Sequence, residues 1–105
     1  MIDKVEIQET ISLYHEGGST ADYDQLWNYL ETKYNLPHGY MRSVANIEAP
    51  SYGRYDPSVT NRYGYRGLFQ IGRDTSVGIG ADYNRLTDPV YNSMYAARLA
   101  DVQRR

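Results

Sequence analysis

Residues 37–50 read PHGYMRSVANIEAP, and this stretch decides the fold prediction. Met41, Val44 and Ala45 recur at the spacing of one helix face. Glu48 follows them by seven, four and three residues, so it is expected on the same apolar face and in the last turn. The stretch therefore predicts a short amphipathic helix that begins near its first proline and ends in an acidic residue.

The expected position of Glu48 has a chemical consequence. Burial on an apolar face and the negative end of a helix dipole both favour the protonated form of a carboxyl group. A protonated carboxylic acid is the group that general-acid cleavage of a glycosidic bond requires. Helix position alone leaves a second interpretation open, in which Glu48 reaches solvent or pairs with Arg42, Arg54 or Arg66.

The chain around this stretch reads as further helices separated by turns. Apolar residues at helical spacing, with glycine, proline or capping residues at the ends, predict four further helices. They cover residues 2–16, residues 20–34, a short stretch that Asp74-Thr75 would cap and that stops at Gly78 or Gly80, and a last helix that starts at Asp88-Pro89. In the second of these, Leu26, Trp27, Leu30 and Tyr34 form one stripe, which is typical of a core face. Residues 50–66 contain two prolines, two glycines and four tyrosines, which predicts a long loop with a short hairpin.

Composition limits the possible classes. The chain has 105 residues, a net charge of −2 and no cysteine, which suits one domain and excludes disulfides and cysteine-ligated metals. The charge does not favour a nucleic-acid partner, and no apolar run is long enough for a signal peptide or a membrane span. Leucine, isoleucine, valine and phenylalanine account for only 20 residues, so some of the 12 tyrosines are expected in the core and others along a cleft.

Several short segments together resemble the soluble lytic transglycosylases of the lysozyme superfamily. They share the order and spacing of that family's motifs and comprise residues 34–37 (YNLP), 45–48 (ANIE), 56–59 (DPSV), 64–71 (GYRGLFQI) and 88–92 (DPVYN). The resemblance covers roughly residues 22–100. It implies an α+β, mainly α, lysozyme-like domain over residues 19–105 with at most a small β-hairpin, preceded by a helical extension over residues 1–18.

The resemblance also implies roles for individual residues. Glu48 matches the single catalytic acid and base, and Gln70 matches a residue of the cleft floor that hydrogen-bonds the substrate. Thr60 or Asn61 matches a serine that helps to place the glycan, and Gly67 would allow backbone to approach the sugar. Leu99 occupies the position of a family tyrosine, for which Tyr91 or Tyr95 would substitute.

Aromatic residues complete the predicted site. Tyr52, Tyr55, Tyr63 and Tyr65 lie between Glu48 and the Gly-Leu-Phe-Gln segment, where their rings would contact a sugar. We therefore predict substrate binding by Tyr52, Tyr55, Tyr65 and Tyr95 beside the residues above. His15 and His38 are isolated from other ligand-type residues, so no metal and no cofactor are predicted.

The implied activity is cleavage of the β-1,4 bond between N-acetylmuramic acid and N-acetylglucosamine in peptidoglycan, with a 1,6-anhydro product. The partner would be a glycan strand of the cell wall or periplasm, and the protein would suit a phage virion. Ala49-Pro50 replaces the family's serine-glycine after the glutamate, and the family domain usually continues further. Two alternatives remain: a lysozyme-like hydrolase with Asp56 or Asp74 as the second carboxylate, and a non-catalytic glycan-binding or virion structural module.

Overall fold

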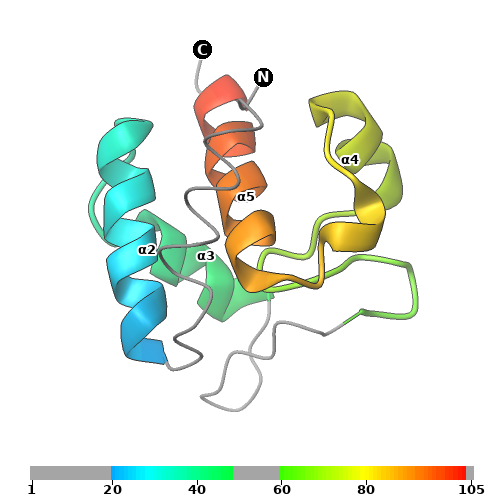
Figure 1. Ribbon diagram of the computed structural model, residues 1–105, viewed down its shortest axis with the longest axis horizontal. Helices are drawn as coiled ribbons and strands as arrows, with labels where there is room; N and C mark the ends of the chain where they lie inside the picture. The colour runs from blue at the N-terminus through cyan, green and yellow to red at the C-terminus, as the bar shows by residue number, and fades with distance from the viewer. Residues whose placement is uncertain (1–19, 49–59, 104–105) are drawn as a thin grey trace.

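A computed structural model describes residues 20–48 and 60–103, and in this part the chain is mainly helical, as predicted (Figure 1). The helices are α2 (Thr20–Lys33), α3 (Tyr40–Glu48), α4 (Arg73–Ile79), the 3₁₀ helix η1 (Tyr83–Arg85) and α5 (Pro89–Gln103). The extension predicted over residues 1–18 lies outside the described residues. None of the helices in the described ranges is long and apolar enough to cross a membrane.

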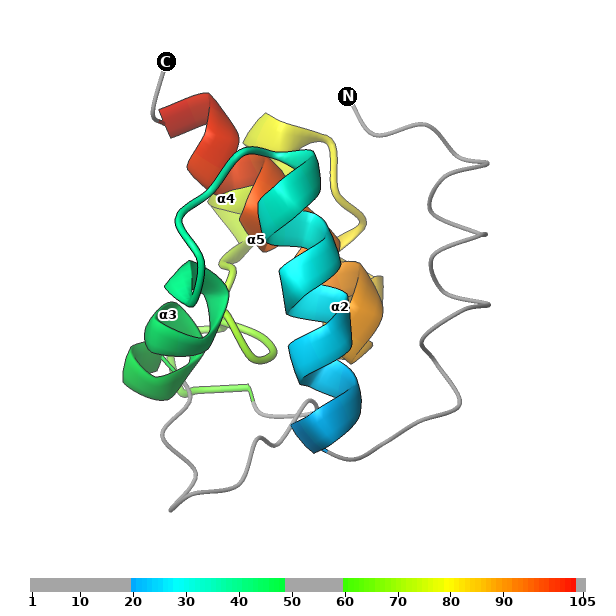
Figure 2. The ribbon, with the colours of Figure 1, turned by 90° about the vertical axis from the view of Figure 1, so that its left-hand side faces the viewer.

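Helix α5 forms the centre of the arrangement. It runs beside α2 and lies between that helix and α4, while α3 packs against α2 (Figures 1 and 2). Residues 60–72, which lead into α4, pass beneath α5 in the view of Figure 1. The end of α3 and this segment are therefore brought to the same side of the central helix.

The core is built around the only tryptophan. Trp27 is 2% exposed and packs against Tyr23 and edge-on against Phe69, each with 5.7 Å between ring centroids. Its indole N–H donates to the Ser93 hydroxyl of α5 at 3.0 Å, which satisfies the buried donor. The predicted core role of Trp27 is confirmed, and α2 packs against α5.

The start of α3 differs from the prediction. The helix begins at Tyr40, because Pro37 lies in a preceding turn closed by the Tyr40 N–H and the Pro37 carbonyl at 3.1 Å. The carboxylate of Glu31 accepts the N–H groups of Gly39 and Met41 at 3.0 and 2.8 Å. Glu31 is 4% exposed, so α2 supplies a buried cap that holds the first turn of α3.

The last two helices follow their sequence signals with one exception. Asp88 caps α5 as expected, since its carboxylate accepts the N–H groups of Val90 and Tyr91 at 2.9 and 3.1 Å. Gly80 ends α4 in the left-handed conformation, with φ 76°. The predicted cap Asp74 is wrong, because α4 begins at Arg73 and places Asp74 within the first turn.

The β-structure in the described residues is limited to two antiparallel bridges. Arg66 pairs with Thr60 on one side and with Ile71 on the other. This agrees with the prediction of at most a small hairpin. A lysozyme-like fold as such stays a prediction.

Candidate functional site

The Gly-Leu-Phe-Gln segment, residues 67–70, is a turn held in place by hydrogen bonds from a buried side chain, and we call it the braced turn. Asn92 of α5 is fully buried, and its carboxamide oxygen accepts the N–H of Phe69 at 3.0 Å. Its carboxamide nitrogen donates to the carbonyl groups of Arg66 and Leu86, both at 2.9 Å. One side chain of the Asp-Pro-x-x-Asn segment therefore fixes both ends of the turn at residues 66–69.

Gly67 has a structural role in the same arrangement. Its φ of +79° suits glycine, and an added Cβ would lie 2.5 Å from the carbonyl oxygen of Leu86 and closer still to the carboxamide of Asn92. The residue is buried. Glycine is therefore required at position 67 because Asn92 packs against it. The predicted approach of a sugar to this backbone stays a prediction.

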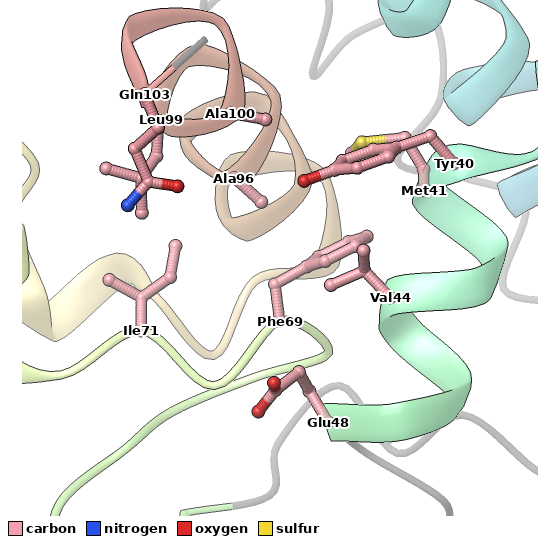
Figure 3. Close-up of a pocket in the computed structure, with 10 residues that line it drawn as sticks. All are labelled: Tyr40, Met41, Val44, Glu48, Phe69, Ile71, Ala96, Leu99, Ala100 and Gln103. Carbon is pink, nitrogen blue, oxygen red and sulfur yellow. The ribbon is translucent and has the colours of Figure 1, made fainter. Parts of the chain in front are cut away.

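A pocket lies where α3, the braced turn and α5 meet, with a volume of about 200 Å³ (Figure 3). Its wall is apolar and comes from all three segments, while polar groups border it: the lining residues are Tyr40, Met41, Val44, Glu48, Phe69, Ile71, Ala96, Leu99, Ala100 and Gln103. An apolar wall with a few polar groups is typical of small-ligand sites.

Glu48 borders this pocket from the last residue of α3 (Figure 3). The expectation that it lies buried on the apolar face is wrong, because the side chain is exposed. Met41 and Ala45 are the fully buried members of that face, and Glu48 lies beyond them where the helix leaves the core. The carboxylate is thus accessible to a ligand while remaining beside an apolar wall.

Tyr40 is a pocket residue that the sequence analysis did not single out. It comes from the first turn of α3, and its hydroxyl reaches into the pocket (Figure 3). The four-residue spacing of Tyr40, Val44 and Glu48 places all three on one helix face, and this was the signal that would have found it. Gln103 borders the pocket from the end of α5, where no comparable signal exists.

Two predicted substrate residues are engaged within the protein instead. Gln70 has a positive φ of 49°, and its side-chain amide donates to the carbonyl of Gly67 at 2.9 Å, which closes its own turn. Gln70 does not line the Glu48 pocket. Thr60 is exposed at the Arg66 bridge, whereas the Asn61 side chain accepts the N–H groups of Tyr63 and Tyr65 at 2.8 and 3.0 Å.

The structure separates Tyr65 and Asp74 from Glu48. Both line a different pocket, which shares no lining residue with the Glu48 pocket. The predicted substrate residues Tyr52 and Tyr55, and the alternative second carboxylate Asp56, lie outside the described residues. Within the described ranges, no cluster of three or more histidine, aspartate or glutamate side chains is suited to hold a metal.

Tyr95 lies in the core rather than at the pocket. It is 3% exposed, its ring packs on Tyr91 with 4.8 Å between centroids, and its hydroxyl donates to the Gly80 carbonyl at 3.5 Å. Burial, together with the hydrogen bond to Tyr91, raises the pKa of Tyr95 to about 12. This placement fits a packing role and gives no support to the predicted contact with substrate.

Comparisons with known proteins leave the functional assignment to the residues themselves. No family model, no curated protein and no solved structure matches this chain. What the structure defines is a mainly helical protein with an accessible carboxylate at the rim of an apolar pocket.

Proposed function

We propose that the protein is a peptidoglycan lytic transglycosylase and that Glu48 is its single acid and base. The observation that carries the proposal is the position of Glu48, at the end of α3 and at the rim of a pocket that the Gly-Leu-Phe-Gln turn and α5 complete. A carboxyl group so placed is open to a glycan on one side and meets an apolar wall on the other.

The connection between the turn and α5 supports the proposal. The segments that carry the family resemblance are far apart in sequence, yet Asn92 binds residues 66 and 69 directly. Phe69 of the same turn then lines the pocket beside Glu48. Two of the segments that carry the resemblance, residues 64–71 and 88–92, are therefore held together next to the Glu48 pocket.

The proposed reaction needs one carboxyl group. Glu48 donates its proton to the oxygen that links N-acetylmuramic acid to N-acetylglucosamine, and the bond from that oxygen to the muramic C1 breaks. The resulting carboxylate takes the proton of the muramic 6-hydroxyl, whose oxygen bonds to C1 and gives the 1,6-anhydro sugar. Because the nucleophile belongs to the substrate, the protein supplies orientation and one proton.

The proposal includes the setting of the reaction. The substrate is a peptidoglycan glycan strand, so the protein acts at the cell wall or in the periplasm, and a component of a phage virion that opens the wall fits this role. The polar rim of the pocket provides hydrogen-bonding groups for such a strand in Tyr40, Glu48 and Gln103.

One observation favours a second candidate, a non-catalytic glycan-binding or virion module. Glu48 is exposed, and the low-dielectric surroundings that normally tune a catalytic acid are only partly provided by the described residues. The hydrolase alternative has less structural support in the described residues, because Asp74 borders another pocket.

Zymography on peptidoglycan gels separates catalysis from binding. The protein should clear the gel, and Glu48→Gln, which keeps the shape but cannot donate a carboxyl proton, should lose roughly 10²–10⁴-fold in activity. The matched control is Asp24→Asn on α2, which removes the same charge outside the pocket and should clear normally. Equal clearing by the parent protein and Glu48→Gln, or none by either, contradicts the proposal.

A further inference from the structure

The hairpin between residues 60 and 66 presents two tyrosine side chains to solvent. Tyr63 is 70% exposed and Tyr65 is 44% exposed, so neither ring contributes much to the core. They belong to a pocket of about 150 Å³ that shares no lining residue with the Glu48 pocket. The function proposed above makes no use of Tyr63 or of this pocket.

Hydrogen bonds to Asn61 hold the backbone of the hairpin that carries these rings. The side-chain oxygen of Asn61 accepts the N–H groups of both Tyr63 and Tyr65, at 2.8 and 3.0 Å. The Asn61 backbone N–H donates to the Tyr65 carbonyl at 2.9 Å, and the Gly64 N–H returns to Asn61 at 3.0 Å. These four hydrogen bonds to Asn61 fix the backbone of the hairpin, and the Tyr63 ring is held by Arg62, whose guanidinium lies 4.8 Å from the ring centroid and donates to the hydroxyl at 2.7 Å. Groups ordered before binding lower the entropy that a ligand has to overcome.

The opposite wall of the pocket comes from Gly72 and the residues that follow it. The Tyr65 ring lies against Gly72 so closely that a Cβ there would come within 2.7 Å of the ring. Arg73, Asp74 and Thr75 complete the lining. The guanidinium of Arg73 stacks on the Tyr83 ring at 4.3 Å, and the Tyr83 hydroxyl donates to Gly64 at 2.6 Å, so Tyr83 links the two walls.

The chemistry of this lining matches a sugar ring. Aromatic faces carry partial negative charge and attract the polarised C–H bonds on one side of a pyranose. The carboxylate of Asp74 accepts from hydroxyl groups, the guanidinium of Arg73 donates to them, and the Thr75 hydroxyl does either. The volume is below the roughly 300–1,000 Å³ of pockets for drug-sized ligands, which suits one ring of a longer chain.

We propose that the Tyr63–Tyr65 pocket is a second glycan-binding site, separate from the Glu48 pocket, which holds one pyranose ring of a β-1,4-linked strand. The choice of strand rests on the function proposed above, whereas binding at the pocket does not require Glu48. The site anchors a polymeric substrate away from the Glu48 pocket, so its loss weakens binding of long strands.

The test uses the 105-residue chain with Glu48→Gln, titrated with the β-1,4-linked tetramer of N-acetylglucosamine and followed by amide NMR. The amide signals of Tyr63, Tyr65 and Asp74 should shift on binding. Tyr63→Ala should weaken the affinity reported by these signals by about fivefold or more. Tyr29→Ala, which removes a tyrosine that is 39% exposed on α2, is the matched control and should leave the affinity unchanged.

The possible outcomes are distinct. Absence of shifts at the hairpin in the Glu48→Gln protein, or an unchanged affinity when Tyr63→Ala is added to it, overturns the second site. Because Tyr63 is so exposed, its removal is not expected to unfold the protein, and Asp74→Ala provides a second variant with the same expected loss. If the protein fails to clear the peptidoglycan gel but the hairpin amide signals still shift on titration, the proposed enzymatic activity is rejected and the second glycan-binding site is retained.

Discussion

The carboxamide of Asn92 on α5 accepts the backbone N–H of Phe69 at 3.0 Å, although 23 residues separate them in the chain. Phe69 packs edge-on against Trp27 in the core and lines the Glu48 pocket. The hydrogen bond therefore joins the central helix, the core and the candidate site.

Asn92→Ala should destabilise the protein by roughly 2–4 kcal/mol, because it removes three hydrogen bonds and leaves buried backbone groups unsatisfied. Urea unfolding monitored by Trp27 fluorescence measures the change. The control is Asn84→Ala on the exposed surface of η1, which should alter the free energy of unfolding by less than about 0.5 kcal/mol. Similar values for the two variants would contradict the bracing role of Asn92.

Replacing three glycines by alanine, one at a time, separates the cost of a steric clash from the cost of a positive φ. Gly67→Ala should cost roughly 3 kcal/mol or more, since the added methyl meets Asn92 and Leu86 at a positive φ. Gly39→Ala has a positive φ of +86° but open space, and should cost about 1–2 kcal/mol. Gly78→Ala, in helix α4 with nothing within 4 Å, should stabilise by about 0.5–1 kcal/mol. Thermal unfolding gives the order, and a loss in Gly67→Ala no larger than that in Gly39→Ala would contradict the contact of residue 67 with Asn92.

Alkaline stability should depend on Tyr95. Its pKa is raised to about 12 in the folded protein, against 10.0 for the free side chain, so the unfolded chain loses the proton first. The contribution of the protonated Tyr95 hydroxyl to the free energy of unfolding is fully present below pH 10 and is lost as the pH rises from 10 to 12. The melting temperature of Tyr95→Phe should therefore fall less than that of the parent protein over this range. The exposed Tyr63→Phe should follow the parent, and an identical fall in all three would exclude Tyr95 as the cause.

Helix α2 and helix α5 were predictable because their apolar residues recur at regular spacing and Asp88 provides a standard cap. The buried positions of Tyr23 and Tyr91 were not predicted. Tyr23 was recoverable, because it precedes Trp27 by four residues and so lies on the same helix face. Family resemblance drew attention to residues 88–92 but not to the bonds that Asn92 makes. These bonds depend on how distant segments meet.

The candidate site was predicted only in part. Glu48 does border a pocket, but the prediction that it is buried was wrong. The spacing of residues along a helix shows which face a side chain occupies, but it does not show how much of that face the rest of the protein covers. Tyr65 was grouped with Glu48 because both lie near the same loop in sequence, whereas the hairpin carries Tyr65 to a different pocket. Tyr40 was recoverable from its four-residue spacing with Val44 and Glu48.

Two carboxylates should respond differently to neutralisation. Glu31→Gln should cost about 1–3 kcal/mol, because the buried carboxylate accepts two backbone N–H groups and an amide offers only one acceptor. Glu48→Gln should change the free energy of unfolding by less than about 0.5 kcal/mol, in the stabilising direction, since a negative charge at a helix C-terminus is unfavourable. Chemical unfolding of both variants provides the comparison. A large loss in Glu48→Gln would mean that this carboxylate serves stability.

Mass spectrometry of digested peptidoglycan tests the central claim most directly. Digestion by the parent protein should release muropeptides that end in 1,6-anhydro-N-acetylmuramic acid, and Glu48→Gln should release none above background. The anhydro end identifies attack by the substrate's own 6-hydroxyl, as the single carboxyl group of Glu48 implies. Muropeptides with ordinary reducing ends, or anhydro products in equal amounts from both proteins, would contradict the account.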